Sequence, residues 1–190
     1  MILKHSGIGL SPDPTSVRSL IHFIMELENL FEYIGGRLLS YGETVAVAES
    51  VTSGFLQFSF SQMKDASQFY KGGMTAYTQE GKVDLLHVDD EEATEYNCVS
   101  GNIAETMALN VAELFKSDWS IGVTGYATPV EESGGRLYAY FAIAYKGTVL
   151  LSEKLDLHTR TKAPNAQLYY SEFILGCFKL ELDKKNEEQD

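Results

Sequence analysis

The first regular pattern in the chain is a long run of apolar residues at helical spacing. Asp13 is followed by Pro14, which favours a helix start because Asp is a good N-cap and Pro fits the first helical position. Apolar residues then recur every three or four positions, at Val17, Leu20, Ile21, Ile24, Leu27, Phe31 and Ile34. This spacing predicts one long amphipathic helix, which passes two glycines and ends at Tyr41.

Five later segments have the composition of β-strands, namely residues 44–48, 69–77, 119–124, 137–145 and 148–157. The first and third are short and apolar, which is typical of strands that are buried on both faces. Gly125 is predicted to end the third strand, and a glycine pair interrupts the second. Lys146-Gly147 lies between the last two strands and predicts a tight hairpin turn.

Helical segments alternate with these strands, at residues 55–60, 79–86, 91–96, 100–115 and from Pro164 onward. Ser100 is a good N-cap for the fourth of them, which carries apolar residues on one face. This alternation is typical of an α/β protein, so we expect a single domain built as a three-layer α/β/α sandwich with a mixed sheet. The charged residues from Asp183 onward are expected to fray.

Composition and charge narrow the function classes. Of the 190 residues, 44% are hydrophobic and 22% are charged, which suits one sizeable core. The formal net charge of -12 argues against general binding of nucleic acid or anionic membranes, because no large positive surface is available. We see no signal-peptide pattern and no apolar run long enough for a membrane span, so we expect a cytoplasmic protein. Cys98 and Cys177 match no metal spacing and are expected to be unpaired thiols.

Three polar loops follow apolar segments and carry the candidate chemistry. In the first, Ser50 and Thr52 stand before a predicted helix, whose free backbone N–H groups can bind a phosphate or stabilise an oxyanion. The same residue types also serve as ordinary helix caps. Glu49 is open to two interpretations, a catalytic group or a carboxylate at the helix start, and we favour the second.

Each of the other two loops can also be interpreted either as part of a functional site or as an ordinary structural element. Lys82, at the end of the segment 77–82, can act as a general base beside a serine if burial lowers its pKa. It can also be a solvated helix lysine. Residues 124–135 form a glycine-rich loop after a strand, which suits either a ligand site or an ordinary connection.

Taken together and in this order, these loops resemble the C-terminal domain of the CinA family. That domain shows the motifs A-E-S-C-T-G-G, Y-S-N-E-x-K, G-A-V-S and T-G-I-A-G-P. At the corresponding places this chain has AESVTSG (48–54), YTQEGK (77–82), NCVS (97–100) and TGYATP (124–129). The similarity runs from about Glu28 to Phe178, and four motifs in order make it specific.

The resemblance also implies a division of the chain. Residues 28–182 correspond to the CinA C-terminal-like amidase domain. Residues 1–27 form an N-terminal extension, made of an irregular leader and the start of the first helix, and residues 183–190 form a charged tail.

The activity that the resemblance implies is hydrolysis of the carboxamide of nicotinamide mononucleotide, which gives nicotinic acid mononucleotide and ammonia in pyridine-nucleotide salvage. Ser50 matches the nucleophile, Lys82 the base that activates it, and Tyr77 the tyrosine that opens the lysine motif. The substrate-binding residues implied by position are Thr52, Ser53, Gly54, Thr124, Gly125 and Arg160. No metal and no organic cofactor is expected, the partner is a small nucleotide, and a homo-oligomer is implied.

Several positions depart from the family pattern. Val51 replaces a cysteine, and Ser53 replaces a glycine whose loss is costly if the position needs a positive φ. Tyr126 adds bulk to the third loop, and residues 128–130 replace its Gly-Pro-Gly-Gly-type continuation. A second hypothesis therefore stands beside the amidase, a catalytically inactive CinA-like nucleotide-binding or regulatory module. The distance between the serine and the lysine, and the space left by Tyr126, distinguish the two.

Overall fold

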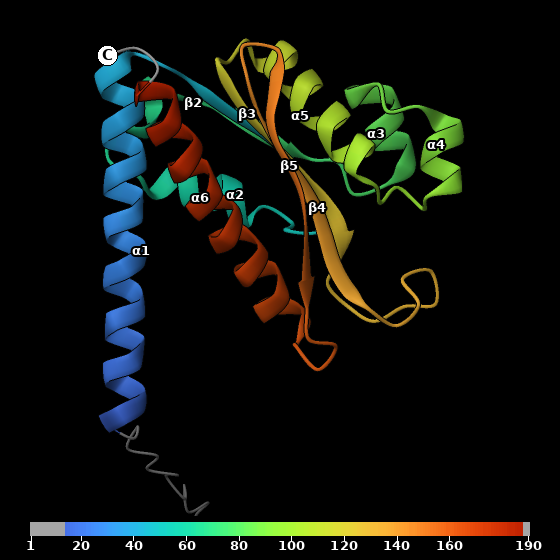
Figure 1. Cartoon of the computed structure of the whole chain (residues 1–190), viewed down its shortest axis with the longest axis horizontal. Coiled ribbons are helices and arrows are strands. Elements are labelled where there is room, and N and C mark those ends of the chain that lie inside the picture. Colours follow the sequence, from blue (N-terminus) through green and yellow to red (C-terminus); the bar gives the residue numbers. More distant parts are fainter. Residues whose placement is uncertain (1–13, 188–190) are drawn as a thin grey trace, which may run out of the picture.

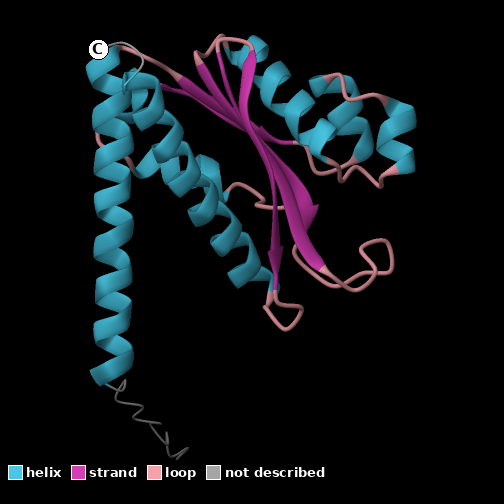
Figure 2. Cartoon of the chain, viewed as in Figure 1, coloured by secondary structure: helices cyan, strands magenta, loops and turns pink. Residues whose placement is uncertain are grey.

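The computed structural model describes residues 14–187, and the placement of side chains is described for residues 27–185. Its centre is a five-stranded sheet in the order β2-β1-β3-β4-β5 (Figures 1 and 2). The strands are β1 (Val45–Glu49), β2 (Tyr70–Thr75), β3 (Trp119–Tyr126), β4 (Leu137–Tyr145) and β5 (Thr148–Leu157). Strand β1 is parallel to β2 and β3, whereas β4 is antiparallel to β3 and β5. The predicted mixed sheet is confirmed.

Helices cover both faces of this sheet (Figure 1). On one face lie α1 (Pro14–Tyr41), α2 (Phe55–Gln62) and α6 (Ala163–Glu187), with a short 3-10 helix (Ala66–Gln68) before β2. On the other face lie α3 (Gln79–Leu86), α4 (Asp90–Glu95) and α5 (Gly101–Phe115). This is the three-layer α/β/α sandwich that the sequence predicts. Within residues 14–187, no helix combines the length and the apolar character that crossing a membrane requires.

The predicted hairpin turn and the predicted helix cap are both confirmed. Lys146 and Gly147 both have left-handed φ values, 47° and 77°, which is the backbone of a tight hairpin between β4 and β5. The Ser100 hydroxyl accepts a hydrogen bond from the Ile103 N–H at 3.0 Å and so caps α5. The residue types at these two positions therefore determine the hairpin and the helix start, as the sequence indicates.

The leader predicted for residues 1–13 lies outside the described residues.

One strand boundary was predicted wrongly. Strand β3 does not end at Gly125 but continues to Tyr126, and Gly125 pairs with Ala139 of β4. A Cβ atom at Gly125 would lie 2.4 Å from the Tyr138 carbonyl oxygen. The glycine is therefore part of the strand pairing, because it allows the two backbones to approach closely.

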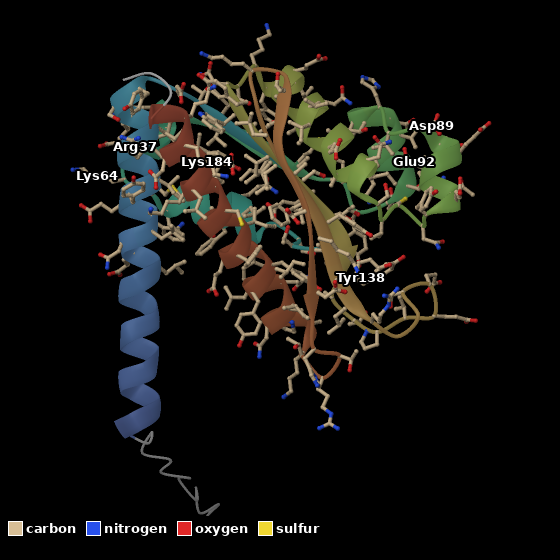
Figure 3. The ribbon with its side chains drawn as sticks, in the orientation of Figure 1. Arg37, Lys64, Asp89, Glu92, Tyr138 and Lys184 are labelled. Atoms are coloured by element: carbon tan, nitrogen blue, oxygen red, sulfur yellow. The ribbon has the colours of Figure 1, made fainter. Side chains whose placement is uncertain are left out.

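The C-terminal residues also differ from expectation. The segment expected to fray from Asp183 is helical as far as Glu187. Ion pairs between side chains one turn apart stabilise these last turns of α6, where Figure 3 labels Lys184. Lys179 Nζ lies 2.9 Å from the Asp183 carboxylate, and Lys184 Nζ lies 2.6 Å from the Glu181 carboxylate.

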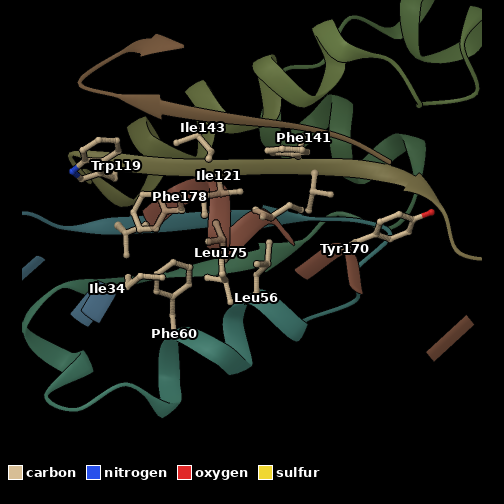
Figure 4. Close-up of a cluster of buried hydrophobic side chains, with 14 of the residues drawn as sticks. Ile34, Leu56, Phe60, Trp119, Ile121, Phe141, Ile143, Tyr170, Leu175 and Phe178 are labelled. Atoms are coloured by element: carbon tan, nitrogen blue, oxygen red, sulfur yellow. The ribbon is translucent and has the colours of Figure 1, made fainter. Parts of the chain in front are cut away.

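The larger hydrophobic core lies between the sheet and the layer of α1, α2 and α6 (Figure 4). Phe178 of α6 packs edge-on against Phe60 of α2 and Trp119 of β3, with ring centroids 5.9 and 5.4 Å apart. Ile34 and Leu38 of α1 are fully buried in the same cluster. Apolar packing therefore fixes these helices to the strands that carry the polar loops.

Candidate active site

Ser50 and Lys82 come from two neighbouring strand-to-helix connections. Ser50 directly follows β1, which lies between β2 and β3 at the centre of the parallel part of the sheet. Lys82 is in α3, which begins just after β2, and the Thr78 hydroxyl caps this helix by accepting the Gly81 N–H. The carboxyl ends of parallel strands meet at one edge of a sheet, so both side chains reach the same place.

The two side chains are in direct contact. Lys82 Nζ lies 3.1 Å from Ser50 Oγ, 2.9 Å from the Ala76 carbonyl oxygen and 3.4 Å from the Tyr77 carbonyl oxygen. Lys82 is only 2% exposed, and this burial lowers its pKa. A neutral amine has two N–H donors and one lone pair. With two carbonyls accepting the N–H groups, the lone pair can face the Ser50 hydroxyl, which is the arrangement of a base and its nucleophile.

Glu49 is the carboxylate at the start of helix α2, as we favoured from the sequence. It is fully buried. Its two oxygens accept hydrogen bonds from the backbone N–H groups of Gly54 at 3.0 Å, Leu56 at 3.1 Å and Gln57 at 2.9 Å. Glu49 therefore positions the turn that follows Ser50.

This arrangement corrects one expectation. The sequence suggested that the N-terminus of α2 offers free N–H groups to a ligand, but Glu49 already occupies the N–H groups of residues 54, 56 and 57. The N–H groups of Val51 and Thr52 have no hydrogen-bond partner within the described part of the chain. Val51 directly follows the serine, whereas Thr52 is fully buried, so the Val51 N–H is the donor left for an oxyanion at this turn.

Replacing Glu49 by Gln is expected to destabilise the fold by about 2–4 kcal/mol. The amide keeps one oxygen and places an NH2 group against backbone N–H donors, so at least one of these buried donors loses its acceptor. The measurement is urea unfolding followed by circular dichroism. Glu113→Gln, on the exposed surface of α5, is the matched control and should leave the midpoint unchanged. Equal midpoints for both variants would contradict the capping role.

A cavity of about 460 Å³ opens beside the pair. Five of the residues predicted from the sequence line it, namely Ser50, Tyr77, Lys82, Thr124 and Gly125. Residues that were not predicted as site residues also line it, namely Val51, Asn97, Cys98, Val99, Tyr126, Ala127, Thr128, Val130, Glu132, Ala163 and Gln167. The volume is within the range of small-molecule sites.

Four predicted binding residues do not line this cavity. Thr52 is fully buried, and its hydroxyl has no hydrogen-bond partner among the described residues. Ser53 and Gly54 border a separate, shallow surface depression. Arg160 is exposed in the connection between β5 and α6. Ser53 has a φ of 51°, so this position does adopt the left-handed backbone that glycine favours.

The sequence analysis did not predict a role for Gln167, which lies near the start of α6. Its side-chain NH2 group donates to the Val51 carbonyl oxygen and to Ser53 Oγ, both at 3.1 Å. Along the chain, Gln167 is 116 positions from Val51 and 114 positions from Ser53. No local signal marks such a contact, because it depends on how α6 packs across α2.

The loop before α5 supplies another wall of the cavity. Asn97 and Cys98 have left-handed φ values of 49° and 62°, and Thr124 Oγ1 donates to the Cys98 carbonyl oxygen at 2.6 Å. Burial raises the pKa of the Cys98 thiol, and nearby Lys82 partly opposes this effect. Cys98 and Cys177 are both free thiols, as the sequence predicts.

Tyr126 lines the cavity and leaves it open. Its ring packs edge-on against Tyr138, with centroids 5.4 Å apart, near the start of β4 (Figure 3). Its carbonyl oxygen accepts a hydrogen bond from the Tyr170 hydroxyl at 3.0 Å. These contacts hold the residue against the wall. Tyr77 also lines the cavity, and its side chain is 71% exposed.

Comparison with known proteins shows which family this chain belongs to. A family model described as the CinA C-terminal domain matches residues 27–168. The chain belongs to this family. Among solved structures, a CinA superfamily protein from Klebsiella pneumoniae superposes with a TM-score of 0.76 at 22% identity, covering 83% of this chain and 98% of that one. Its counterpart from Escherichia coli gives a TM-score of 0.69 at 26% identity, covering 82% and 89%.

Curated CinA relatives are longer than this chain. A CinA-like protein of Rippkaea orientalis is 36% identical over 113 residues, which is 60% of this chain and 27% of the relative. A putative competence-damage inducible protein of Streptococcus agalactiae is 40% identical over 92 residues, which is 48% of this chain and 22% of the relative. The chain therefore spans about a quarter of the length of these CinA proteins.

Proposed function

We propose that this chain is an amidase that hydrolyses the carboxamide of nicotinamide mononucleotide to nicotinic acid mononucleotide and ammonia. The observation that carries the proposal is the 3.1 Å separation of Ser50 Oγ and Lys82 Nζ. Both side chains are buried at the wall of an open cavity, and burial lowers the pKa of the lysine. A serine beside a neutral lysine is a nucleophile beside its base.

The reaction proceeds in two balanced halves. Neutral Lys82 accepts the Ser50 hydroxyl proton while Oγ bonds to the carboxamide carbon, and the carbonyl electron pair moves onto oxygen. The N–H group of Val51, a residue that lines the cavity, can donate to this oxyanion. Lys82 then gives its proton to the amide nitrogen, the C–N bond breaks, and ammonia leaves an ester on Ser50. Water attacks this ester with Lys82 again as base, which releases the carboxylic acid and restores Ser50.

The other cavity residues suit an amide-bearing aromatic ring. Tyr77 and Tyr126 offer aromatic surface, and the side-chain amides of Asn97 and Gln167 offer donors and acceptors. The cavity also has an opening through which a larger nucleotide can extend. Within the part of the chain that the structure describes, Glu132 and Lys82 are the charged residues that line it.

The alternative function is a catalytically inactive CinA-like module that binds a nucleotide or has a regulatory role. Two observations weigh against an amidase that acts on a phosphorylated nucleotide. Arg160 is not part of the cavity wall, so among the described residues no lining basic side chain other than Lys82 is available for a phosphate. Ser53 holds a left-handed backbone that is strained for a residue with a side chain. Both features bear on substrate binding and leave the Ser50–Lys82 pair intact.

Ammonia release from nicotinamide mononucleotide by the purified protein tests the proposal, with Ser50→Ala as the paired variant. We expect release by the wild-type protein and none above background by the variant, because the alanine has no nucleophile. Calorimetric titration of the same ligand runs in parallel. Binding without ammonia release by well-folded wild-type protein would contradict the amidase and support the inactive module.

A further inference from the structure

A side chain of helix α6 holds the turn that follows Ser50. The side-chain NH2 group of Gln167 donates to the Val51 carbonyl oxygen and to Ser53 Oγ, both at 3.1 Å. An amide NH2 group has two N–H donors, so each of these contacts uses one of them. Gln167 therefore contacts the turn at two points.

Ser53 connects Gln167 to the peptide group that carries the Val51 N–H. Its Oγ accepts from Gln167 and donates to the Ser50 carbonyl oxygen at 3.4 Å. The backbone N–H of Ser53 donates to the same carbonyl oxygen at 3.2 Å. In a trans peptide group the C=O and N–H bonds point in opposite directions. The two hydrogen bonds that hold the Ser50 C=O therefore also fix the direction of the Val51 N–H.

The peptide groups on both sides of Val51 are anchored in this way. The group before it is held through the Ser50 carbonyl, and the group after it is held through the Val51 carbonyl. Because peptide groups are planar, their orientations set the two backbone dihedrals of the residue between them. Val51 lines the cavity, and its N–H has no hydrogen-bond partner within the described part of the chain. The donor left for an oxyanion is therefore held in one orientation.

The packing of α6 keeps Gln167 itself in place. Ala166 and Tyr170, on the same turn of the helix, are both fully buried. The Tyr170 hydroxyl donates to the Tyr126 carbonyl oxygen at 3.0 Å, and Ser171 Oγ donates to the Gln167 carbonyl oxygen at 2.8 Å. Side chains on packed helices hold a site more accurately than side chains on loops.

We propose that Gln167, acting directly and through Ser53, is a positioning residue that orients the Val51 N–H toward the oxyanion of the tetrahedral intermediate. This inference rests on the proposed amidase function. It also gives a reason for a serine at a position whose φ is 51°. Glycine fits such a backbone with less strain, but it has no hydroxyl to connect Gln167 with the Ser50 carbonyl.

Gln167→Met tests this role, because methionine has a similar length and donates no hydrogen bond. We expect kcat for ammonia release to fall about 10–100-fold while KM stays within about twofold, because a misplaced donor affects the transition state more than substrate binding. Gln62→Met is the matched control, since Gln62 is exposed on α2 and donates to neighbouring Ser61, and it should leave kcat unchanged. Equal kcat values for the two variants would refute the role. A higher KM with unchanged kcat would also refute it, since Gln167 would then bind the substrate instead.

A double-mutant cycle tests the connection through Ser53. Ser53→Gly should lower kcat, and the double variant with Gln167→Met should be no slower than Gln167→Met alone, because both changes break the same chain of hydrogen bonds. Circular dichroism checks that all three variants are folded. Unchanged kcat in Ser53→Gly, or losses that multiply in the double variant, would exclude the connection.

Crystal structures of the wild-type protein and of Gln167→Met test the inference without turnover. We expect the peptide group between Ser50 and Val51 to change its orientation in this variant and to keep it in Gln62→Met. An unchanged peptide group in Gln167→Met would overturn the positioning role even in an active enzyme. If the wild-type protein releases no ammonia, the amidase proposal fails, and the orientation of this peptide group decides separately whether Gln167 positions the turn.

Discussion

Lys82→Met is expected to lower kcat for ammonia release by about 10²–10⁴-fold, the usual contribution of a general base. Methionine has a similar length and is apolar, so it can occupy a site where the lysine is 2% exposed. It cannot accept the Ser50 proton. The loss should appear mainly in kcat, because the amine acts on the reacting bond. Lys64→Met changes an exposed lysine outside the cavity and should leave kcat unchanged.

The wild-type pH profile gives a second readout of the same lysine. The base must be unprotonated, so kcat/KM should rise as the pH increases through the pKa of Lys82. Burial lowers this pKa from its ordinary value of 10.5, so the rise should occur below that pH. Activity is lost as the pH falls through the shifted pKa. Wild-type turnover by folded Lys82→Met protein, or a rate independent of pH, would contradict this role.

Gly122→Ala is expected to destabilise the fold by about 3–5 kcal/mol, near the upper end for a single substitution. Gly122 lies in β3 beneath α5. A Cβ atom there would lie 2.2 Å from the Ala104 carbonyl oxygen and 2.5 Å from the Ala108 backbone nitrogen. Both atoms belong to the helix backbone, which cannot turn aside as a side chain can. Helix α5 must therefore move off the sheet, and its packing is lost.

Urea unfolding measures this effect against a control with the same chemical change. Gly36 lies in α1, and a Cβ atom there would meet nothing within 4 Å. Gly36→Ala should therefore stabilise the protein by about 0.5–1 kcal/mol, because alanine favours the helix and glycine does not. Opposite signs for the two substitutions are the expected result. A shift below about 1 kcal/mol for Gly122→Ala would mean that α5 adapts more easily than its contacts indicate.

The elements with strong local signals were predicted well. The helix from Pro14 to Tyr41, the two long strands β4 and β5, and the hairpin at Lys146-Gly147 all lie where periodicity and turn chemistry place them. Each of these signals depends on residues that are close in the sequence. The candidate pair had no such local signal, since Ser50 and Lys82 were assigned by the resemblance of four motifs, in order, to the CinA C-terminal domain.

Predictions failed where contacts between distant segments decide the outcome. Gly125 continues β3 because the backbone of β4 approaches it. Gln167 reaches the turn after Ser50 only because α6 packs across α2. Neither of these facts has a signal in its own stretch of sequence.

By itself, the sequence determined the α/β class, the order of the elements and the two residues that the proposed chemistry needs. The tertiary structure alone decided that these residues meet. They are 32 positions apart, and it is the pairing of β1 with β2 and the packing of α3 that bring Lys82 Nζ to 3.1 Å from Ser50 Oγ. The same packing removes the lysine from water, and burial lowers its pKa because a charged amine is less stable there than a neutral one.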